Sequence, residues 1–307
     1  MVLSAVALTG ATGMLGRHVV SALESQGIRV LSCARVARQG KDSADRRIWD
    51  LGQWRSMDEM DALFEGAQAI VHAGAMVPGN SKLPGEAELF DVNVRACLNL
   101  GEWALARSVP VVHVSGAIVY AEQDRENIDE SAPTGYTGFG GFYGLTKVLA
   151  EDIFQRLQQR GLQAAVLRPS SIYGAGLSPT KMLRKFLATA AAGGTIELVP
   201  PIEDRIDLIH AADVAAAVAA VLKTGAWTTF NLASGHPSTV REIADACLAV
   251  TGKGDIQVRG DVKNARTPGV RFSLNCERAN RALGWSPGVS LHQGMAALFE
   301  NRVLTPG

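Results

Sequence analysis

Short apolar runs alternate with amphipathic stretches along the chain, and this alternation constrains the fold more than any other feature of the sequence. The amphipathic stretches with helical periodicity are Met14–Gln26, Met57–Phe64, Glu86–Arg107 and Phe142–Arg160. The apolar runs of strand length are Ser4–Leu8, Arg29–Ala34, Ala69–Ala73, Val111–Ser115 and Ala164–Arg168. Strands that alternate with helices in this way predict a parallel sheet covered by helices on both faces.

The sequence changes character after Pro169, where glycine and proline become frequent and the helical stretches, such as Lys181–Ala192 and Thr239–Thr251, become shorter. A chain of 307 residues is long enough for one large α/β domain with a smaller lobe. We expect residues 1–172 to form the main domain and residues 206–234 to cross back to it. The smaller lobe is expected to contain residues 173–205 and 235–307.

The charge and cysteine content exclude several classes of partner and ligand. The 30 Lys and Arg residues balance the 30 Asp and Glu residues, and no basic block stands out, so we expect neither nucleic acid nor membrane as a partner. The four cysteines lack CxxC spacing, which predicts no disulfide framework and no metal site and fits a reducing compartment. Because no secretory signal and no apolar run of about 18 residues is present, we expect a cytoplasmic protein.

The strongest local motif is Thr9-Gly10-Ala11-Thr12-Gly13-Met14-Leu15-Gly16, which follows a strand-like run and opens a helical stretch. In such a motif Gly10 allows a tight turn, Gly13 lets the backbone approach a pyrophosphate, and Gly16 lets the helix pack closely on the strand. The helix N-terminus then offers free N–H groups to the phosphates. The motif predicts a dinucleotide-binding loop; a glycine-rich turn without a ligand is the alternative.

The end of the second strand bears on the choice of dinucleotide. It reads Cys33-Ala34-Arg35, with Arg38 close by, and the first acidic residue after it is Asp42. Sites that prefer NAD usually place an acidic residue here to hold the ribose 2′-hydroxyl. A guanidinium at this position can instead bind a 2′-phosphate through two hydrogen bonds. We therefore predict NADP, with NAD left open and a solvated surface arginine as the alternative.

A second constellation is formed by Tyr143 and Lys147, which the four-residue spacing places on one face of a helix. A phenol is a weak acid, and a cation held beside it stabilises the phenolate. Such a pair can exchange a proton with a carbonyl or hydroxyl while hydride moves to or from a nicotinamide. An exposed Tyr–Lys pair without function is the alternative, and the N-terminal glycine loop favours the functional interpretation.

Together these motifs resemble the extended short-chain dehydrogenase/reductase family, the group of nucleotide-sugar epimerases, dehydratases and ketoreductases. The resemblance covers essentially the whole chain and implies an α/β Rossmann fold, a doubly wound parallel sheet with a smaller C-terminal substrate-binding lobe. Besides the glycine loop and the Tyr–Lys pair, the matching segments are Trp49–Leu51, His72–Ala75, Asp91–Val94, Val114–Tyr120, Leu167–Gly174, Ile206–Val214 and Leu283–Pro287.

The resemblance also implies roles for individual residues, with Tyr143 and Lys147 as the acid–base pair. The residues that it places at the cofactor are Gly10, Thr12, Gly13, Met14, Leu15, Gly16, Arg35, Asp50, Leu51, Ala73, Gly74, Ala75, Asn93, Tyr143, Lys147, Pro169 and Ser171. The residues that it places at the substrate are Gly116, Ala117, Tyr143, Ser170, Arg205 and Arg266. It further implies a homodimer formed through the stretches Glu86–Arg107 and Phe142–Arg160.

The sequence departs from the family where a catalytic Ser or Thr is expected, because that position is Gly116. Ser115 lies one residue earlier, and adjacent side chains of an extended strand point to opposite faces. Three hypotheses stay open: a backbone shift brings Ser115 to the substrate, another group such as Ser170, Ser171 or a water replaces it, or the chemistry is altered. We take Ser115 as the candidate catalytic hydroxyl.

Two further groups have both a structural and a functional explanation. Arg205 and Arg266 lie near positions where relatives bind a diphosphate, although each could be a surface arginine, and Ser171 stands where many epimerases have Asn. Asp207, His210 and Asp213 could form a cluster, but their spacing favours hydrogen bonds that fix loops and helix ends.

The expected activity is NADP(H)-linked reduction of a ketone on a nucleotide-linked deoxysugar, or epimerisation if the hydride returns to the same substrate. One alternative is a reductase of a non-sugar ketone, such as a flavonoid-like or steroid-like molecule. Another is a regulatory NADP-binding protein with altered catalysis, which Gly116 would motivate.

Overall fold

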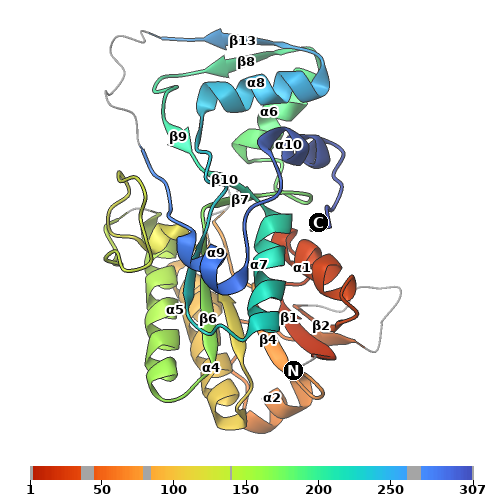
Figure 1. The fold of residues 1–307 in the computed structure, drawn as a ribbon, viewed down its shortest axis with the longest axis vertical. Coiled ribbons are helices and arrows are strands. Elements are labelled where there is room, and N and C mark those ends of the chain that lie inside the picture. Colours follow the sequence, from red (N-terminus) through yellow and green to blue (C-terminus); the bar gives the residue numbers. More distant parts are fainter. Residues whose placement is uncertain (1–2, 36–44, 79–83, 139, 261–270, 306–307) are drawn as a thin grey trace.

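A computed structural model describes residues 3–35, 45–78, 84–138, 140–260 and 271–305, and its main body is built on a seven-stranded parallel sheet (Figure 1). The strand order is β11-β6-β5-β4-β1-β2-β3. The strands are β1 (Ala5–Thr9), β2 (Arg29–Ala34), β3 (Arg46–Ile48), β4 (Ala69–His72), β5 (Val111–Val114), β6 (Ala164–Pro169) and β11 (Thr229–Leu232). The doubly wound parallel sheet expected from the sequence is confirmed, and its strand order reverses between β1 and β4, where such folds bind ligands.

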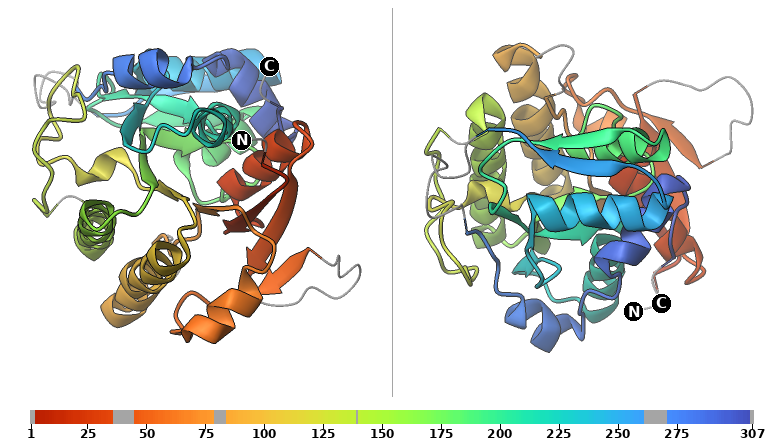
Figure 2. Two further views of the ribbon diagram at one scale, coloured as in Figure 1. Left: turned by 60° about the horizontal axis from the view of Figure 1, so that its bottom comes forward. Right: turned by 90° about the horizontal axis from the view of Figure 1, so that it is seen from above.

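Helices cover both faces of the sheet because its central strands turn apolar side chains to both sides (Figure 2). In β5, for example, Val112 and Val114 join one hydrophobic cluster while Val111 joins the other. The helices on the first face are α1 (Met14–Glu24), α7 (Ala211–Thr224) and α9 (Glu277–Leu283). Those on the second face are α2 (Met57–Leu63), α4 (Ala96–Arg107) and α5 (Gly141–Gln159).

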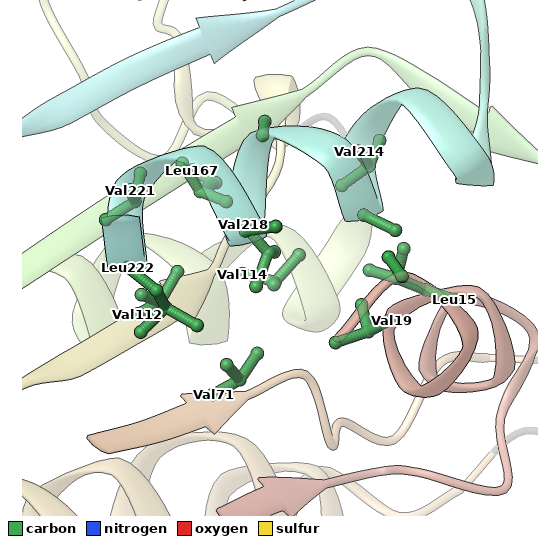
Figure 3. Packing of buried hydrophobic residues seen from close by; sticks show 14 of the residues in the cluster. Leu15, Val19, Val71, Val112, Val114, Leu167, Val214, Val218, Val221 and Leu222 are labelled. Carbon is green, nitrogen blue, oxygen red and sulfur yellow. The ribbon is translucent and has the colours of Figure 1, made fainter. Parts of the chain in front are cut away.

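Helix α7 packs directly on the sheet, beside α1 (Figure 3). Val218 of α7 lies over Val114 of β5, and Leu222 lies over Val112. All four side chains are buried, and each removes apolar surface from water at roughly 25 cal/mol per Å². The close packing of α1 and α7 fixes the start of α1, and with it the glycine loop, on the sheet.

The smaller lobe lies above the main body in Figure 1 and has its own hydrophobic cluster. The parallel pair β8–β13 and the antiparallel pair β9–β12 belong to it, while β7 and β10 pair at its base. Its elements are β7 (Ser171–Tyr173), α6 (Met182–Ala191), β8 (Thr195–Leu198), β9 (Arg205–Ile206), β10 (Leu208–His210), β12 (Ser238–Thr239), α8 (Val240–Thr251), β13 (Asp255–Val258) and α10 (Leu291–Phe299). Helices α8 and α10 each begin at a capping box, which satisfies their first N–H groups. Among the described residues, no helix has the length and apolarity needed to cross a bilayer.

The structure differs from the sequence expectations in several elements. The stretch Glu86–Arg107 is helical throughout, but a π-helical turn, Asp91–Arg95, separates α3 (Glu86–Phe90) from α4. The short strand β3 was not expected, because its sequence Arg-Arg-Ile has no strand-like apolar pattern. Helix α9 lies within the range expected for the smaller lobe, yet its buried Ala279 and Leu283 join the core cluster beneath α1 and α7.

Four histidines of the described structure are buried, and burial lowers the pKa of each imidazole. Desolvation lowers the pKa of His72 to about 3 and that of His210 to about 4. The pKa of His113 falls well below 6.5, because its ring is fully buried between the rings of His72 and Phe154. The folded chain therefore holds these rings neutral at pH values where an unfolded chain binds protons.

We expect the free energy of unfolding to fall as the pH drops below about 6.5, since the unfolded state then binds protons that the native state does not. Replacing His113 by Leu should make this decline shallower by about 1.4 kcal/mol per pH unit, which is the contribution of one proton. Urea unfolding at several pH values between 4.5 and 8 measures it, with the exposed His236→Leu as the matched control. An unchanged slope in His113→Leu would contradict the assignment.

Candidate cofactor and catalytic site

The glycine loop joins β1 to α1 in a turn that leaves no room for a side chain at Gly10 or at Gly16. Gly10 has a φ of 71°, and a Cβ on it would lie 2.8 Å from the Cα of Gly74. A Cβ on Gly16 would collide with the carbonyl oxygen of Gly10 and lie 2.7 Å from the Cα of Ala11. Gly13 is the N-cap of α1 and has no side chain to satisfy the first N–H groups of the helix. These groups stay available to an anion.

A cavity of about 1050 Å³ extends from this loop across the carboxyl ends of β1, β2 and β4. It is lined by nine residues that the sequence predicts at the cofactor, namely Gly10, Thr12, Gly13, Arg35, Asp50, Leu51, Ala73, Gly74 and Ala75. It is also lined by residues that the sequence reasoning missed, among them Thr9, Cys33, Trp49, Gln53, Met76, Glu88 and Ser178. The volume is at the upper end of the range for small-molecule sites, as an extended ligand requires.

The other eight predicted cofactor residues do not line this cavity. Leu15 is buried in the core beneath α1, and Gly16 supports the turn. Asn93 is buried, and its amide bonds the backbone of Met76 through both Oδ1 (2.7 Å) and Nδ2 (3.0 Å). The remaining predicted cofactor residues outside the lining are Met14, Tyr143, Lys147, Pro169 and Ser171.

The end of β2 supplies an exposed Arg35 to the cavity wall. Next to it, Arg47 of β3 pairs in register with Cys33 of β2. Burial raises the pKa of the Cys33 thiol to about 12, although the Arg47 charge opposes this. Sequence reasoning missed Arg47 because β3 has no recognisable pattern. Arg38 and Asp42 lie outside the described residues.

Tyr143 and Lys147 lie on one face of α5, as the spacing predicted. The Lys147 ammonium is buried and donates a hydrogen bond to the carbonyl oxygen of Val114, 3.1 Å away. The ammonium nitrogen also lies 5.9 Å from the centre of the Tyr143 ring. The end of β5 therefore fixes a cation beside the phenol. Thr146, between them, donates to the Tyr143 carbonyl and accepts from Asn93, which links α5 to the loop after β4.

Ser115 and Gly116 follow β5 in an extended conformation. The Ser115 N–H donates to the Leu167 carbonyl, which continues the sheet, and its Oγ is buried without a hydrogen-bond partner among the described residues. Gly116 has φ 178° and ψ 159°, which any residue adopts. A Cβ there would meet only Ile118 Cγ2 at 3.8 Å and the Pro169 oxygen at 3.9 Å. Neither backbone nor packing therefore requires a glycine at this position.

The predicted substrate residues come from several different elements. Ala117 is buried in the 3-10 turn Ala117–Val119, and the Ser170 hydroxyl donates to Asp207 Oδ1 over 2.9 Å. Arg205 is exposed at β9, where its guanidinium donates to the Pro237 carbonyl. Arg266 lies outside the described residues.

The structural interpretation of Asp207, His210 and Asp213 is confirmed. His210 accepts a hydrogen bond from the Ala212 N–H and so caps α7. Asp207 accepts from Ser170 and from the Ser234 N–H, and Asp213 accepts from two N–H groups of the loop before α10.

A buried ion pair between Arg168 of β6 and Glu151 of α5 holds this helix to the sheet. The guanidinium donates to both carboxylate oxygens, and the two side chains are 9% and 10% exposed. Arg168 also donates to the Tyr120 hydroxyl (3.1 Å), which donates to Asn231 of β11 (2.6 Å). Glu151 lies one helical turn after Lys147, so its position on the same face of α5 as Lys147 could have been found from the sequence.

His72, Cys97 and His113 form a second buried group, with potential ligand atoms within 4.8 Å of one another. Their surroundings oppose a cation, because the Lys147 charge acts on all three side chains and lowers the pKa of both imidazoles. Burial raises the pKa of the Cys97 thiol to about 12, so a metal-binding thiolate is disfavoured. His72 instead bonds the Thr9 hydroxyl, 2.8 Å away, which supports the glycine loop.

The fold and the loop define a dinucleotide-binding enzyme of the α/β class, and comparisons with known proteins identify its family. A profile of the NAD dependent epimerase/dehydratase family matches residues 6–233, and the chain belongs to this family. It is therefore an NAD(P)-linked enzyme of the extended short-chain dehydrogenase/reductase type, as the resemblance implied.

Characterised relatives include reductases and epimerases. The chain is 30% identical over 274 residues to a dTDP-4-dehydro-6-deoxy-D-allose reductase of a Streptomyces species. The match covers 81% of this chain and 81% of the relative. It is 28% identical over 312 residues to a UDP-glucose 4-epimerase of Halalkalibacterium halodurans, covering 92% of this chain and 90% of the relative.

Solved structures share the fold over nearly the whole chain. MoeE5 in complex with UDP-glucuronic acid and NAD superposes with a TM-score of 0.79 at 23% identity, covering 96% of this chain and 98% of that one. The UDP-glucose 4-epimerase of Thermotoga maritima with UDP-glucose gives 0.81 at 21% identity, covering 97% and 98%.

The network around Arg168 makes a prediction about stability. Replacing Arg168 by Met leaves the Glu151 carboxylate buried without its cation, so we expect a loss of roughly 3–5 kcal/mol in the free energy of unfolding. The matched control is Arg160→Met, which removes the cation of an exposed pair with Glu102 and should cost at most about 1 kcal/mol. Equal losses in the two variants, measured by urea unfolding, would contradict a buried network.

Proposed function

We propose that the protein is an NADP(H)-dependent reductase of a ketone on a nucleotide-linked deoxysugar. The observation that carries this proposal is the buried Lys147 ammonium, held by the Val114 carbonyl beside the Tyr143 ring. Lys147 is bonded to the last residue of β5. The carboxyl ends of the parallel strands, where the glycine loop and its cavity also lie, are therefore on the same side of the sheet as this pair. A proton-transfer pair on that side suits an enzyme that couples proton and hydride transfer.

The residues around the cavity fit a dinucleotide. Gly10 and Gly13 present backbone at the N-terminus of α1, where a pyrophosphate can approach without meeting side chains. Arg35, from the cavity wall at the end of β2, would hold a ribose 2′-phosphate. The cavity wall also contains Asp50 and Leu51, which would contact the adenine end.

The bound nicotinamide supplies the hydride in reduction. Tyr143 donates the proton to the substrate oxygen in this direction and accepts it in oxidation. The Lys147 ammonium stabilises the negative charge that develops on the phenol oxygen as the proton leaves, and its bond to Val114 keeps it in place. Ser115 is our candidate for polarising the substrate oxygen.

A nucleotide-linked sugar is the proposed substrate because relatives that are 28–30% identical to this chain act on dTDP-sugars or UDP-sugars by name. Epimerisation is the second candidate, since one of these relatives is an epimerase and several structures with this fold hold NAD. A regulatory protein without catalysis is less well supported, because the Tyr143–Lys147 geometry is intact.

The assembly and location of the protein also stay predictions. A homodimer through α4 and α5 is the expectation, and the molar mass in solution decides it. The four cysteines are free thiols, which fits a reducing, cytoplasmic compartment.

Titration of the purified protein with NADPH and NADH tests the choice of cofactor. We expect tighter binding of NADPH, with Arg35→Ala raising its Kd by about 10-fold to 100-fold through loss of a charge-assisted contact. The Kd for NADH should change little, as should both values in Arg241→Ala, a control on the exposed face of α8. A preference for NADH, or tightly retained NAD, favours the epimerase. Binding of neither nucleotide would overturn the proposal.

A second test concerns the catalytic hydroxyl. We expect Ser115→Ala to lower kcat by about 100-fold, the usual loss for one polarising hydrogen bond. Adding Gly116→Ser should restore part of it, because the structure has space for that side chain. Gly116→Ala in the same background is the matched control, since it adds the Cβ without a hydroxyl. Turnover of Ser115→Ala at the wild-type rate would exclude Ser115.

A further inference from the structure

The cofactor cavity has one wall that does not come from the main domain. Ser178 lines the cavity together with Thr12 and Gly13 of the glycine loop. It belongs to the loop between β7 and α6, within the range 173–205 that the sequence assigned to the smaller lobe. This part of the chain therefore reaches the end of the cavity where the N-terminus of α1 can hold phosphates.

The loop that carries Ser178 packs against α1. Gly176 has a φ of 87°, and a Cβ on it would lie 3.7 Å from the Cα of Met14, the first residue of the helix. A Cβ on Gly174 would lie 3.0 Å from His18 Nε2. Because the backbone at both glycines lies against residues of α1, the loop is placed beside the N-terminus of this helix.

The C-terminal segment bonds both the loop and the helix. The Gly176 N–H donates to Asn301 Oδ1 over 2.9 Å, just after α10. His18 Nδ1 donates to the Leu304 carbonyl over 3.3 Å, because a carbonyl oxygen can only accept. Asn301 has a φ of 54°, in the left-handed region. The segment thus bridges α1 and the Ser178 loop.

The Ser178 hydroxyl is suited to donate to a phosphate. Its Oγ accepts from the Thr180 N–H at 3.4 Å and lies 2.9 Å from the Thr180 hydroxyl, which can supply the proton of that bond. The Ser178 proton can then be directed into the cavity. A hydroxyl that donates to an ionised phosphate makes a stronger bond than one between neutral groups.

We propose that Ser178 binds the pyrophosphate of the dinucleotide from the smaller-lobe side, and that Asn301 is a positioning residue that holds Ser178 there through Gly176. The inference rests on the proposed cofactor binding and adds two residues to it. It also couples the cofactor site to the C-terminal segment, more than 280 residues after the glycine loop.

The direct test is Ser178→Ala, titrated with NADPH and with adenosine 2′-monophosphate, which lacks the pyrophosphate. We expect the Kd for NADPH to rise about tenfold and the Kd for adenosine 2′-monophosphate to stay at the wild-type value. An unchanged Kd for NADPH overturns the assignment of Ser178. Equal weakening of both ligands overturns its placement at the pyrophosphate.

The positioning role is tested with two substitutions at Asn301. Asn301→Gly keeps the left-handed conformation and removes the acceptor, so the Kd for NADPH should rise about threefold or more. Asn301→Asp tolerates the same conformation and keeps an oxygen for the Gly176 N–H, so it should bind as the wild type does. A lower Tm in Asn301→Gly without any change in Kd would show a structural role only and overturn the positioning role.

The wild-type titration separates failure of this inference from failure of the proposed function. If the wild type binds neither NADPH nor NADH, the proposed function fails and the inference fails with it. If the wild type binds and the variants do not differ from it, the inference alone fails.

Discussion

The pairing of Arg168 with Glu151 is the interaction on which the rest of the site depends. Removing two charges from water costs several kcal/mol per ion unless each finds its partner, so the guanidinium and carboxylate can be buried only in contact. That contact ties α5 to β6. Through Tyr120 and Asn231 it reaches β11 as well. Lys147, one turn earlier on α5, is thereby held where its ammonium can meet the end of β5.

The remaining site follows from a topological constraint. Strand order reverses between β1 and β4, and the connections leaving those strands diverge, which opens a crevice at their carboxyl ends. The glycine loop occupies one side of it, and the backbone of Gly74 packs against Gly10 on the other. The cavity is therefore lined by the backbone of Gly10 and Gly13 at the glycine loop and by side chains such as Arg35 and Trp49 farther along.

Much of the fold could be predicted because its signals are local. The run Arg29–Ala34 matches β2 residue for residue, and the start of α1 at Met14 follows from the glycine that precedes it. The strand β3 could not be predicted, since Arg46 and Arg47 carry no strand pattern and pair only because β2 lies beside them. The single helix expected over Glu86–Arg107 contains a π turn that apolar periodicity does not reveal.

The sequence by itself determined the class of fold, the glycine loop at the start of α1 and the shared helix face of Tyr143 and Lys147, because each depends on residues within a few positions of one another. Only the tertiary structure decided which distant segments come together: Arg168 contacts Glu151, Asn301 contacts Gly176, and Ser178 lines the same cavity as Thr12. It also showed that Gly116 has space for a side chain that the sequence omits. Such contacts depend on how helices and strands pack around a shared core, and no short stretch of sequence encodes that packing.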